Sequence, residues 1–247
     1  MLNIVIPMAG RGSRFSEQGY LDPKPLLKIN NKLMIEGVID NLKPSCKHRF
    51  IFICQEEHIT KYNLDIRIAS HSKKAVIIPI NYITKGAAST VLLARDYIDN
   101  DSQLMIANSD QWIDFSIDYY INSFNKIGSD GMIMTMTSTE DKWSYVRFNN
   151  SGNVTEVVEK EVVSNDATVG IYNFRKGSDF CSAANDMISA EKTVNGEFYV
   201  APVYNEMIKN SKVISTLNIG SPGQGMYGLG TPEDFQFFLK SGKEKEF

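Results

Sequence analysis

A glycine-rich loop directly after the first apolar run of the chain has residues that could hold a phosphate. Gly10 and Gly12 stand two positions apart, so the backbone can turn sharply and bring its N–H groups against an anion without interference from a Cβ atom. Arg14 adds a planar guanidinium whose donors suit phosphate oxygens. Further along, two prolines flank Lys24 and restrict the backbone around it. Fixed cations suit phosphoryl transfer, which depends on positioning and charge neutralisation.

Two common phosphate loops differ from this pattern. A dinucleotide-binding loop requires a third glycine and an acidic residue at the end of the second strand. Here Phe15 stands in place of that glycine, and the second apolar run ends in Cys54 and Gln55. A P-loop requires Gly-Lys-Ser/Thr, which this segment lacks. The combination with Arg14 and Lys24 therefore favours an NTP-binding loop over a purely structural turn.

A carboxylate follows a later apolar run. Residues 104–107 are expected to form a strand, and Asn108, Ser109 and Asp110 come directly after it. A carboxylate at the carboxyl end of a central parallel strand stands in the crevice where open α/β sheets bind ligands. Mg²⁺ prefers few carboxylates together with substrate phosphates, so Asp110 is a candidate Mg²⁺ ligand. An aspartate that only forms a turn is the alternative.

The elements that must position these residues can be read from periodicity. Short β-rich runs and helical patterns alternate in the first half, which favours βαβ units and a mainly parallel sheet. Strands are expected there at residues 2–7, 50–54, 75–80 and 104–107, and helices at 34–42, 56–70 and 87–97. In the second half, strands are expected at 131–137, 145–148, 154–158, 169–174 and 212–217, with a hairpin turn at 149–153, and helices at 178–189, 199–209 and 232–239. The last few residues are expected to fray.

We therefore expect a single α/β domain over residues 1–247. Its fold would be Rossmann-like, with a mixed, mainly parallel central sheet flanked by helices. The NTP-binding half would span about residues 1–128 and a small β-rich, acceptor-binding half about residues 129–247.

Composition limits the partners and the compartment. The net charge of -3 and the pI near 5.7 give no reason to expect nucleic acid or an anionic membrane as a partner. No apolar stretch is long enough to span a bilayer, and the first residues do not resemble a signal peptide, so we expect a cytoplasmic protein. The cysteines have neither metal nor disulfide spacing and are expected to be buried thiols in a reducing compartment: Cys46, Cys54 and Cys181.

Together these motifs resemble the sugar-phosphate nucleotidyltransferases, and most of all a short capsule-biosynthesis subgroup whose loop reads I-P-M-A-G-x-G-S-R-F. The likeness runs through nearly the whole chain. The family pattern G-x-G-x-R followed by P-K is matched by Gly10, Gly12, Arg14, Pro23 and Lys24. The resemblance implies that Arg14 holds NTP phosphates and that Lys24 stabilises the α-phosphate under attack, both as catalytic residues. It also implies that Asp110 binds Mg²⁺.

The resemblance further implies nucleotide contacts from a small-residue helix start after the third strand. Gly86 would pass close to the base with Asn81 at its edge, and a plain helix N-terminus is the alternative for this segment. The expected nucleotide-binding residues are Ala9, Gly10, Arg11, Gly12, Ser13, Arg14, Lys24, Asn81, Gly86 and Ala87.

In the second half, Glu159 and Lys160 are similar to the V-E-K motif that contacts the acceptor and its phosphate in the family. A solvated Glu–Lys pair is the alternative, but the preceding hairpin and the following strand also match. The expected acceptor-binding residues are Tyr145, Glu159, Lys160, Gly170, Tyr172 and Glu197. One position departs from the pattern, since many relatives carry a second Mg²⁺-binding aspartate where this chain has Gly228. The second metal ligand is therefore left open.

What the resemblance implies is a nucleotidyltransferase of the pyrophosphorylase type. It would join an NTP to a sugar 1-phosphate or another small phosphorylated metabolite, with Mg²⁺ as cofactor, and serve capsule biosynthesis. A glycosyltransferase that uses a nucleotide-sugar is the alternative, because residues 108–110 form a degenerate D-x-D metal motif. A regulatory module that binds a nucleotide without turnover is a third. The base, the acceptor and a homo-oligomeric assembly are left open.

Overall fold

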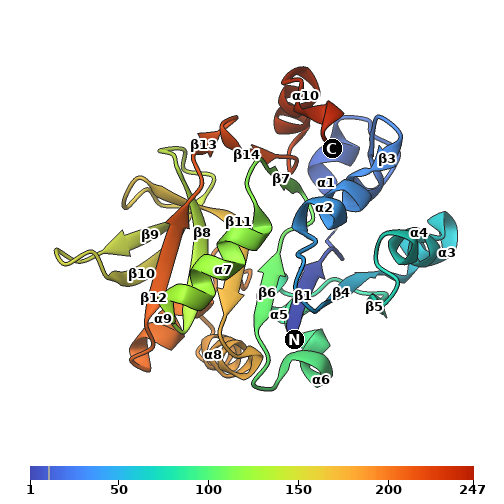
Figure 1. Cartoon of the computed structure of the whole chain (residues 1–247). Coiled ribbons are helices and arrows are strands. Elements are labelled where there is room, and N and C mark those ends of the chain that lie inside the picture. Colours follow the sequence, from blue (N-terminus) through green and yellow to red (C-terminus); the bar gives the residue numbers. More distant parts are fainter. Residues whose placement is uncertain (11) are drawn as a thin grey trace.

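The computed structural model of the chain describes residues 1–10 and 12–247, and their strands form one large mixed sheet (Figure 1). Four strands of the first half pair in parallel in the order β5-β4-β1-β6, and β11 then pairs antiparallel with β6. Beyond β11 the sheet continues as β9-β10 and as β8-β12. The strands are β1 Leu2–Pro7, β4 His48–Gln55, β5 Val76–Ile80, β6 Leu104–Ala107, β8 Gly131–Thr137, β9 Ser144–Phe148, β10 Val154–Glu159, β11 Asp166–Phe174 and β12 Ile214–Asn218.

The order of the parallel strands reverses beside β1. The chain runs outward from β1 through β4 to β5 and then returns to β6 on the other side of β1. In open α/β sheets, ligands bind outside the carboxyl ends of the strands at such a reversal. The glycine-rich loop follows β1, and Asp110 follows β6. The topology alone therefore brings the two motifs singled out in the sequence to one crevice.

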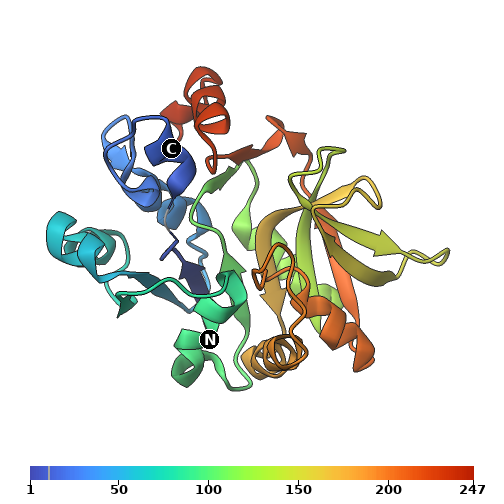
Figure 2. The same ribbon diagram turned by 180° about the vertical axis from the view of Figure 1, so that it is seen from behind.

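Helices cover both faces of the sheet (Figures 1 and 2). One face packs against α2 Met34–Leu42, α3 Glu56–Tyr62, α4 Leu64–His71 and α7 Ile117–Ile127, and the other against α5 Ala87–Val91, α6 Arg95–Ile98, α8 Gly177–Ser189 and α9 Val203–Lys209. The central strands are buried on both sides: Ile4 and Ile6 belong to one core and Val5 to the other. This is why the central strands read as nearly continuous apolar runs.

A third apolar cluster joins the two ends of the chain beside the crevice. Its rings include Phe15, Trp112 and Phe238. Its members come mainly from α1 Ser13–Glu17, β2 Lys28–Ile29, α2, β7 Gln111–Ile113, β14 Gly225–Gly228 and α10 Pro232–Lys240. The 3₁₀ turn Lys24–Leu26 precedes β2, β2 pairs with β3 Lys32–Leu33, and β14 pairs with β7 and with β13 Ser221–Pro222. The expectation of a frayed C-terminus is wrong, because Phe247 packs 5.5 Å from the Phe238 ring and against Gly37.

Most predicted elements are confirmed, including the hairpin at 149–153 between the antiparallel β9 and β10. Three helices differ. The helix expected at 56–70 is interrupted at Asn63, whose φ of 52° lies in the left-handed region. The segment 87–97 becomes α5, the 3₁₀ turn Leu92–Ala94 and α6. The helix expected from 199 begins only at Val203, after Pro202. Helix α7 was not predicted, and Cys46 is exposed rather than buried.

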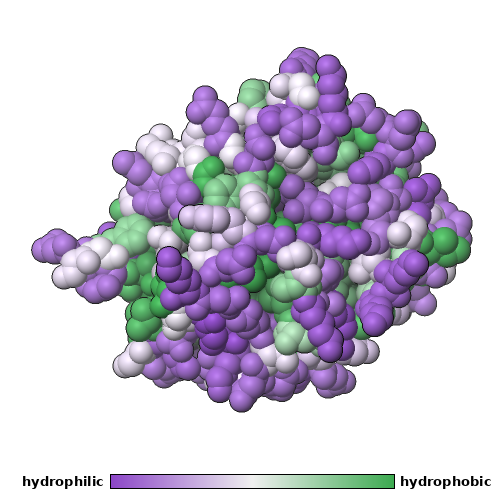
Figure 3. Space-filling model, viewed as in Figure 1, coloured by the Kyte–Doolittle hydropathy of each residue, from purple (hydrophilic) through white to green (hydrophobic). Residues whose placement is uncertain are grey.

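Polar and charged side chains cover most of the face seen in Figure 3, with small, scattered apolar areas. Such scattered apolar residues are normal for a folded domain. Within residues 1–10 and 12–247, no helix is both long and apolar enough to cross a membrane.

Candidate active site

Two adjoining cavities open at the carboxyl ends of β1 and β6. The first, of about 570 Å³, is lined by the glycine-rich loop, Lys24, the start of α5 and Asp110. The second, of about 480 Å³, lies over β9, the end of β10 and β11. Both volumes suit small-molecule ligands. The same five residues line both cavities and mark their boundary: Arg14, Asp110, Glu197, Tyr199 and Gly230. A group in one cavity can therefore meet a group in the other.

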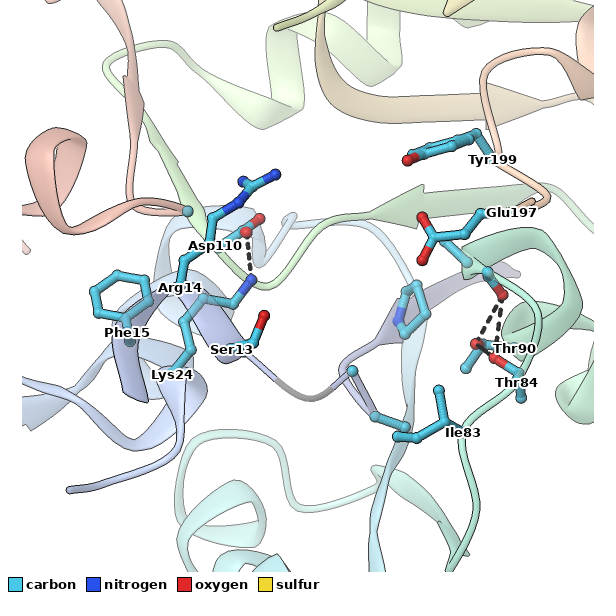
Figure 4. A pocket seen from close by; sticks show the side chains of 17 residues that line it. Ser13, Arg14, Phe15, Lys24, Ile83, Thr84, Thr90, Asp110, Glu197 and Tyr199 are labelled. Atoms are coloured by element: carbon cyan, nitrogen blue, oxygen red, sulfur yellow. Dashed lines mark hydrogen bonds and ion pairs between the residues drawn. The ribbon is translucent and has the colours of Figure 1, made fainter. Parts of the chain in front are cut away.

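Lys24 and Asp110 form an ion pair on the first-cavity side of this boundary. The Lys24 Nζ lies 2.6 Å from Asp110 Oδ2, with the two side chains 22% and 21% exposed (Figure 4). Arg14 lies beside them, and its guanidinium makes no hydrogen bond to another residue that the structure describes. The structure thus brings Arg14, Lys24 and Asp110 to one cavity, and their roles toward a nucleotide stay predictions.

The backbone around this pair explains the residues of the loop. Gly12 has a φ of 62°, and a Cβ there would lie 3.3 Å from Lys24 Cβ, so glycine lets the two segments approach. Phe15, which stands where a dinucleotide loop has glycine, is buried and packs edge-on against Tyr20 and Phe235. The aromatic ring therefore anchors the loop to α10.

The start of α5 forms the far wall of the first cavity. Gly86 has a φ of 112°, and its carbonyl accepts hydrogen bonds from the Thr84 and Thr90 hydroxyls at 3.2 and 3.0 Å. The Phe198 backbone holds it from the other side by bonding Lys85 O at 2.7 Å and the Ala88 N–H at 3.0 Å. Thr84, Thr90 and the neighbouring Ile83 also line the cavity, and no motif in the sequence marked them as site residues.

We expect Gly86→Ala to destabilise this wall strongly. A Cβ there would lie 2.6 Å from both the N and the O of Phe198, in addition to the strain of the positive φ. Gly196→Ala is the matched control, because Gly196 has a φ of 76° and open space around its Cβ position. Gly86→Ala should lose at least about 2 kcal/mol more than Gly196→Ala in denaturant unfolding. Equal losses would show that contact with Phe198 has no role.

The second cavity is lined mainly by hydroxyl, amide and carboxylate groups. Glu159 accepts a hydrogen bond from the Ser144 hydroxyl, and Thr168 is bonded to the Tyr172 hydroxyl at 3.0 Å. Gly170 has a φ of 82° at the point where the register of β11 against β8 shifts. A Cβ there would lie 2.4 Å from the side chains of Asn108 and Gln111, so glycine brings β11 against the segment before Asp110.

Glu159 is a carboxylate of this cavity whose pKa is shifted by its environment. Burial raises the pKa of its carboxyl above the ordinary value, although the hydrogen bond from Ser144 and the charge of Lys160 oppose the shift. Glu197 adds to the rise. In its charged form this carboxylate can accept hydrogen bonds from a ligand that carries hydroxyl groups.

Two lysines of the second cavity lie near aromatic rings. The Lys160 Nζ is 5.0 Å from the centroid of Tyr199, and the Lys142 Nζ is 4.8 Å from the centroid of Trp143. Lys142 also pairs with Asp234 at 3.1 Å, which joins the loop before β9 to the first turn of α10. Both rings thus already have a cation close by.

The donor set around Asp110 fits one Mg²⁺ ion held with substrate phosphates. Asp110 stands on the boundary of the two cavities, and a Cβ at Gly230 would lie 2.8 Å from Asp110 Oδ2, so this glycine leaves room beside the carboxylate. Gly228 lines the second cavity, and its Cβ position lies 3.4 Å from the Asp234 carboxylate. Within the part of the chain that the structure describes, no group of three or more His, Cys, Asp or Glu side chains could hold a metal. A Mg²⁺ ion bound here would depend on Asp110 together with waters and phosphate oxygens.

Most residues expected at the site line the cavities. The first cavity contains Ala9, Gly10, Gly12, Ser13, Arg14, Lys24, Gly86, Ala87 and Asp110, and the second contains Glu159, Lys160, Gly170, Tyr172 and Glu197. Arg11 lies outside the described residues. Two expected residues line neither cavity: Asn81 is exposed, and Tyr145 is buried, with its hydroxyl bonded to Glu140 O at 2.7 Å.

Tyr199 was missed by the sequence reading. It was placed at the start of a helix, whereas it lies in the loop before α9 and lines both cavities. Pro202 could have signalled this, because proline is favoured at the first helical position and restricts the residue before it.

Comparison with known proteins agrees with this geometry. The family model described as nucleotidyl transferase matches residues 4–212. The chain belongs to this nucleotidyl transferase family. The matched span includes the glycine-rich loop, Lys24, Asp110 and the residues expected to bind an acceptor.

Other nucleotidyl transferase proteins resemble the chain over different lengths. Mannose-1-phosphate guanylyltransferase catalytic subunit beta of Danio rerio is 26% identical over 187 residues, which cover 70% of this chain and 49% of that protein. The chain thus spans about half the length of this relative, and 48% of a bifunctional protein of Methanococcus maripaludis. UTP–glucose-1-phosphate uridylyltransferase of Haloferax volcanii is 21% identical and covers 94% of this chain and 93% of its own.

A solved structure of a nucleoside-diphosphate-sugar pyrophosphorylase from Vibrio cholerae RC9 has a TM-score of 0.82 at 26% identity and covers 96% of this chain and 99% of its own. A UDP-glucose pyrophosphorylase complexed with UDP-glucose has a TM-score of 0.77 at 16% identity, covers 99% of each chain and shares the fold. The expected mixed α/β architecture of the nucleotidyl transferase family is thereby confirmed.

Proposed function

We propose that the chain is a sugar-phosphate nucleotidyltransferase of the pyrophosphorylase type. The observation that carries this proposal is the pair of adjoining cavities that share Arg14 and Asp110. The first has the cations that a triphosphate needs, and the second has a lysine and hydroxyl-binding groups that suit a phosphorylated polyol. The names of the relatives, which act on mannose 1-phosphate and glucose 1-phosphate, support the same chemistry.

The proposed reaction is an in-line displacement at the α-phosphorus of the NTP. An oxygen of the acceptor phosphate forms a new bond to that phosphorus, the bond to the bridging oxygen of the β-phosphate breaks, and pyrophosphate leaves with the electron pair. A phosphate monoester has a second pKa of about 6, so it is nucleophilic at neutral pH without a general base. The side chains must therefore align two anions and neutralise their charge.

Arg14 and Lys24 would neutralise the NTP side of the reaction, and Lys160 the acceptor phosphate. Mg²⁺, held by Asp110 and phosphate oxygens, would supply further charge neutralisation on the pyrophosphate. The Lys24–Asp110 ion pair holds the lysine beside the carboxylate that would bind the metal.

The second cavity favours a hydroxyl-rich acceptor over an amino-alcohol phosphate. A quaternary ammonium is usually recognised by open aromatic faces. Here the Trp143 ring has Lys142 over one face, and the Tyr199 hydroxyl accepts a hydrogen bond from Lys160, so a second cation beside either ring would be repelled. Glu159, Thr168 and Ser144 instead offer hydrogen-bonding partners for hydroxyl groups. We further propose that the activated product serves capsule polysaccharide assembly in the cytoplasm, on the strength of the loop motif alone.

The test is pyrophosphate release with each NTP and a panel of sugar 1-phosphates, polyol phosphates and amino-alcohol phosphates. The proposal predicts release only when an NTP and a phosphorylated acceptor are both present. The alternative, a glycosyltransferase, predicts no pyrophosphate from any NTP and instead release of a nucleoside diphosphate from a nucleotide-sugar. Tight NTP binding with no turnover would point to a regulatory module.

Acid should inhibit the reaction through Glu159. Because the pKa of this carboxyl is raised, it loses its charge at a higher pH than an ordinary glutamate does, and kcat/KM for the acceptor should fall as pH drops through that raised value. The same shift affects folding stability. The stabilisation that the protonated Glu159 contributes is fully present below the ordinary pKa of a glutamate, and it is lost as the pH rises through the raised pKa. Glu159→Gln should remove this limb of the profile.

The acceptor phosphate also titrates in acid, so the comparison must be made between variants. The fall in activity that comes from the acceptor phosphate should persist in Glu159→Gln. Glu156→Gln is the control, because Glu156 is an exposed residue of the same strand that pairs with Arg147, and it should also keep that fall. If wild type and Glu159→Gln gave superimposable acid limbs, Glu159 would not control acceptor use.

A further inference from the structure

Lys160 differs from the other lysines of the two cavities in the partner of its ammonium group. Lys24 lies 2.6 Å from Asp110 and Lys142 lies 3.1 Å from Asp234, so a carboxylate neutralises each of them. The Lys160 Nζ instead donates a hydrogen bond to the Tyr199 hydroxyl at 2.9 Å. Among the described side chains, no carboxylate oxygen lies within 4.0 Å of it. The charge of Lys160 is therefore left for an incoming anion.

Tyr199 holds this ammonium through its hydroxyl. The hydroxyl accepts the hydrogen bond at 2.9 Å, and Nζ lies 5.0 Å from the ring centroid, beyond the hydroxyl end of the ring. Burial raises the pKa of Tyr199, although the hydrogen bond from Lys160 opposes this, so the phenol is neutral at ordinary pH. A neutral phenol fixes the direction of a lysine without cancelling its charge, as a carboxylate would.

The backbones of both residues are fixed as well. Lys160 has a φ of 58°, which is uncommon for a residue with a side chain, and its N–H donates to Trp143 O at 3.0 Å. Tyr199 follows Phe198, whose backbone bonds Lys85 and Ala88 of the nucleotide side. Strained backbone persists where the surrounding structure imposes it, and it is common at functional sites. Figure 4 places Tyr199 across the first cavity from Arg14.

We propose that Tyr199 is a positioning residue that holds the Lys160 ammonium, with its charge intact, toward the boundary of the two cavities for the phosphate of the acceptor. The identity of this anion rests on the proposed function. The contact between Tyr199 and Lys160 does not rest on that function. It predicts that Lys160 binds any small phosphate more weakly when Tyr199 no longer positions its ammonium.

A double-mutant cycle on inorganic phosphate tests this directly. Calorimetry would compare wild type, Tyr199→Phe, Lys160→Met and the double variant, with Tyr119→Phe as a control because Tyr119 is exposed on α7 and lines neither cavity. Tyr199→Phe keeps the ring and should weaken phosphate binding about ten-fold, the scale of a hydrogen bond to a charged group. Lys160→Met should weaken it at least as much, and the double variant should be no worse than Lys160→Met.

Two results would overturn the proposal. In the first, Tyr199→Phe binds phosphate as tightly as Tyr119→Phe does. In the second, Tyr199→Phe weakens phosphate binding by the same factor whether residue 160 is the native Lys160 or is replaced in Lys160→Met. Tyr199→Glu adds a second test, because a carboxylate would neutralise Lys160, and it should bind phosphate more weakly than Tyr199→Phe.

Kinetics separate this proposal from the proposed function. In an active enzyme, Tyr199→Phe should raise KM for the acceptor phosphate and leave KM for the NTP unchanged, which a general loss of structure would not do. Absence of pyrophosphate release from the wild type with every pair of substrates would refute the function, and the phosphate cycle would still decide the role of Tyr199.

Discussion

Lys24→Met should lower kcat by about 100- to 1000-fold, the usual loss when one preorganised donor to a transition-state charge is removed. Lys24 is fixed between two prolines, and its ammonium lies 2.6 Å from Asp110 at the boundary of the two cavities. Because the lost ammonium would act mainly on charge that develops in the transition state, the effect on turnover should exceed the effect on KM for the NTP. Steady-state rates of pyrophosphate release would measure both.

The chain offers a matched control for this variant. Lys32 pairs with Asp40 at 2.8 Å and lines neither cavity, so Lys32→Met removes a lysine from an ion pair of similar length. Exposed pairs of this kind contribute at most about 1 kcal/mol. Lys32→Met should keep wild-type turnover. A Lys24→Met enzyme within a few-fold of wild type would remove Lys24 from the chemistry.

Asp110→Asn should cause a loss of similar size, at least about 100-fold in kcat, and should change the response to Mg²⁺. The amide preserves the shape of the side chain and a hydrogen-bond acceptor for Lys24, but it loses the charge that we propose holds the metal. A Mg²⁺ titration of NTP binding, followed by calorimetry, would report this independently of turnover. Metal should tighten NTP binding in the wild type much more than in the variant.

Asp40→Asn completes the comparison, since it alters the partner of Lys32 outside both cavities. Its Mg²⁺ response should match that of the wild type. If Asp110→Asn also kept the wild-type response, another group would have to bind the metal, and Asp110 would serve only as the partner of Lys24.

The sequence predicted those features in which local chemistry and topology agree. The strand-then-loop pattern around Gly10 and the strand that ends before Asp110 placed both motifs at carboxyl ends of parallel strands, and reversal of the strand order brought them together. Gly86 and Gly170 were assigned to binding from resemblance. The structure adds that each also makes room for a backbone or side-chain contact that a Cβ would prevent.

The features that could not be predicted depend on long-range packing. The ordered C-terminus requires Phe247 to meet Gly37, and sequence periodicity contains no record of that contact. Tyr145 alternates into the core rather than into the cavity, because the neighbouring Ser144 takes the cavity face of β9. Tyr199 became recognisable only when the loop before α9 was seen to cross the boundary of the two cavities.

The most direct test of the account follows the phosphorus atoms of the NTP. Two samples of the preferred NTP, one radiolabelled at the α-phosphorus and one at the γ-phosphorus, would be incubated separately with the acceptor. The account predicts that the α-label is found in the nucleotide-linked product and the γ-label in pyrophosphate, in equal amounts. Recovery of the γ-label as inorganic phosphate, with the α-label in a free nucleoside diphosphate, would contradict it.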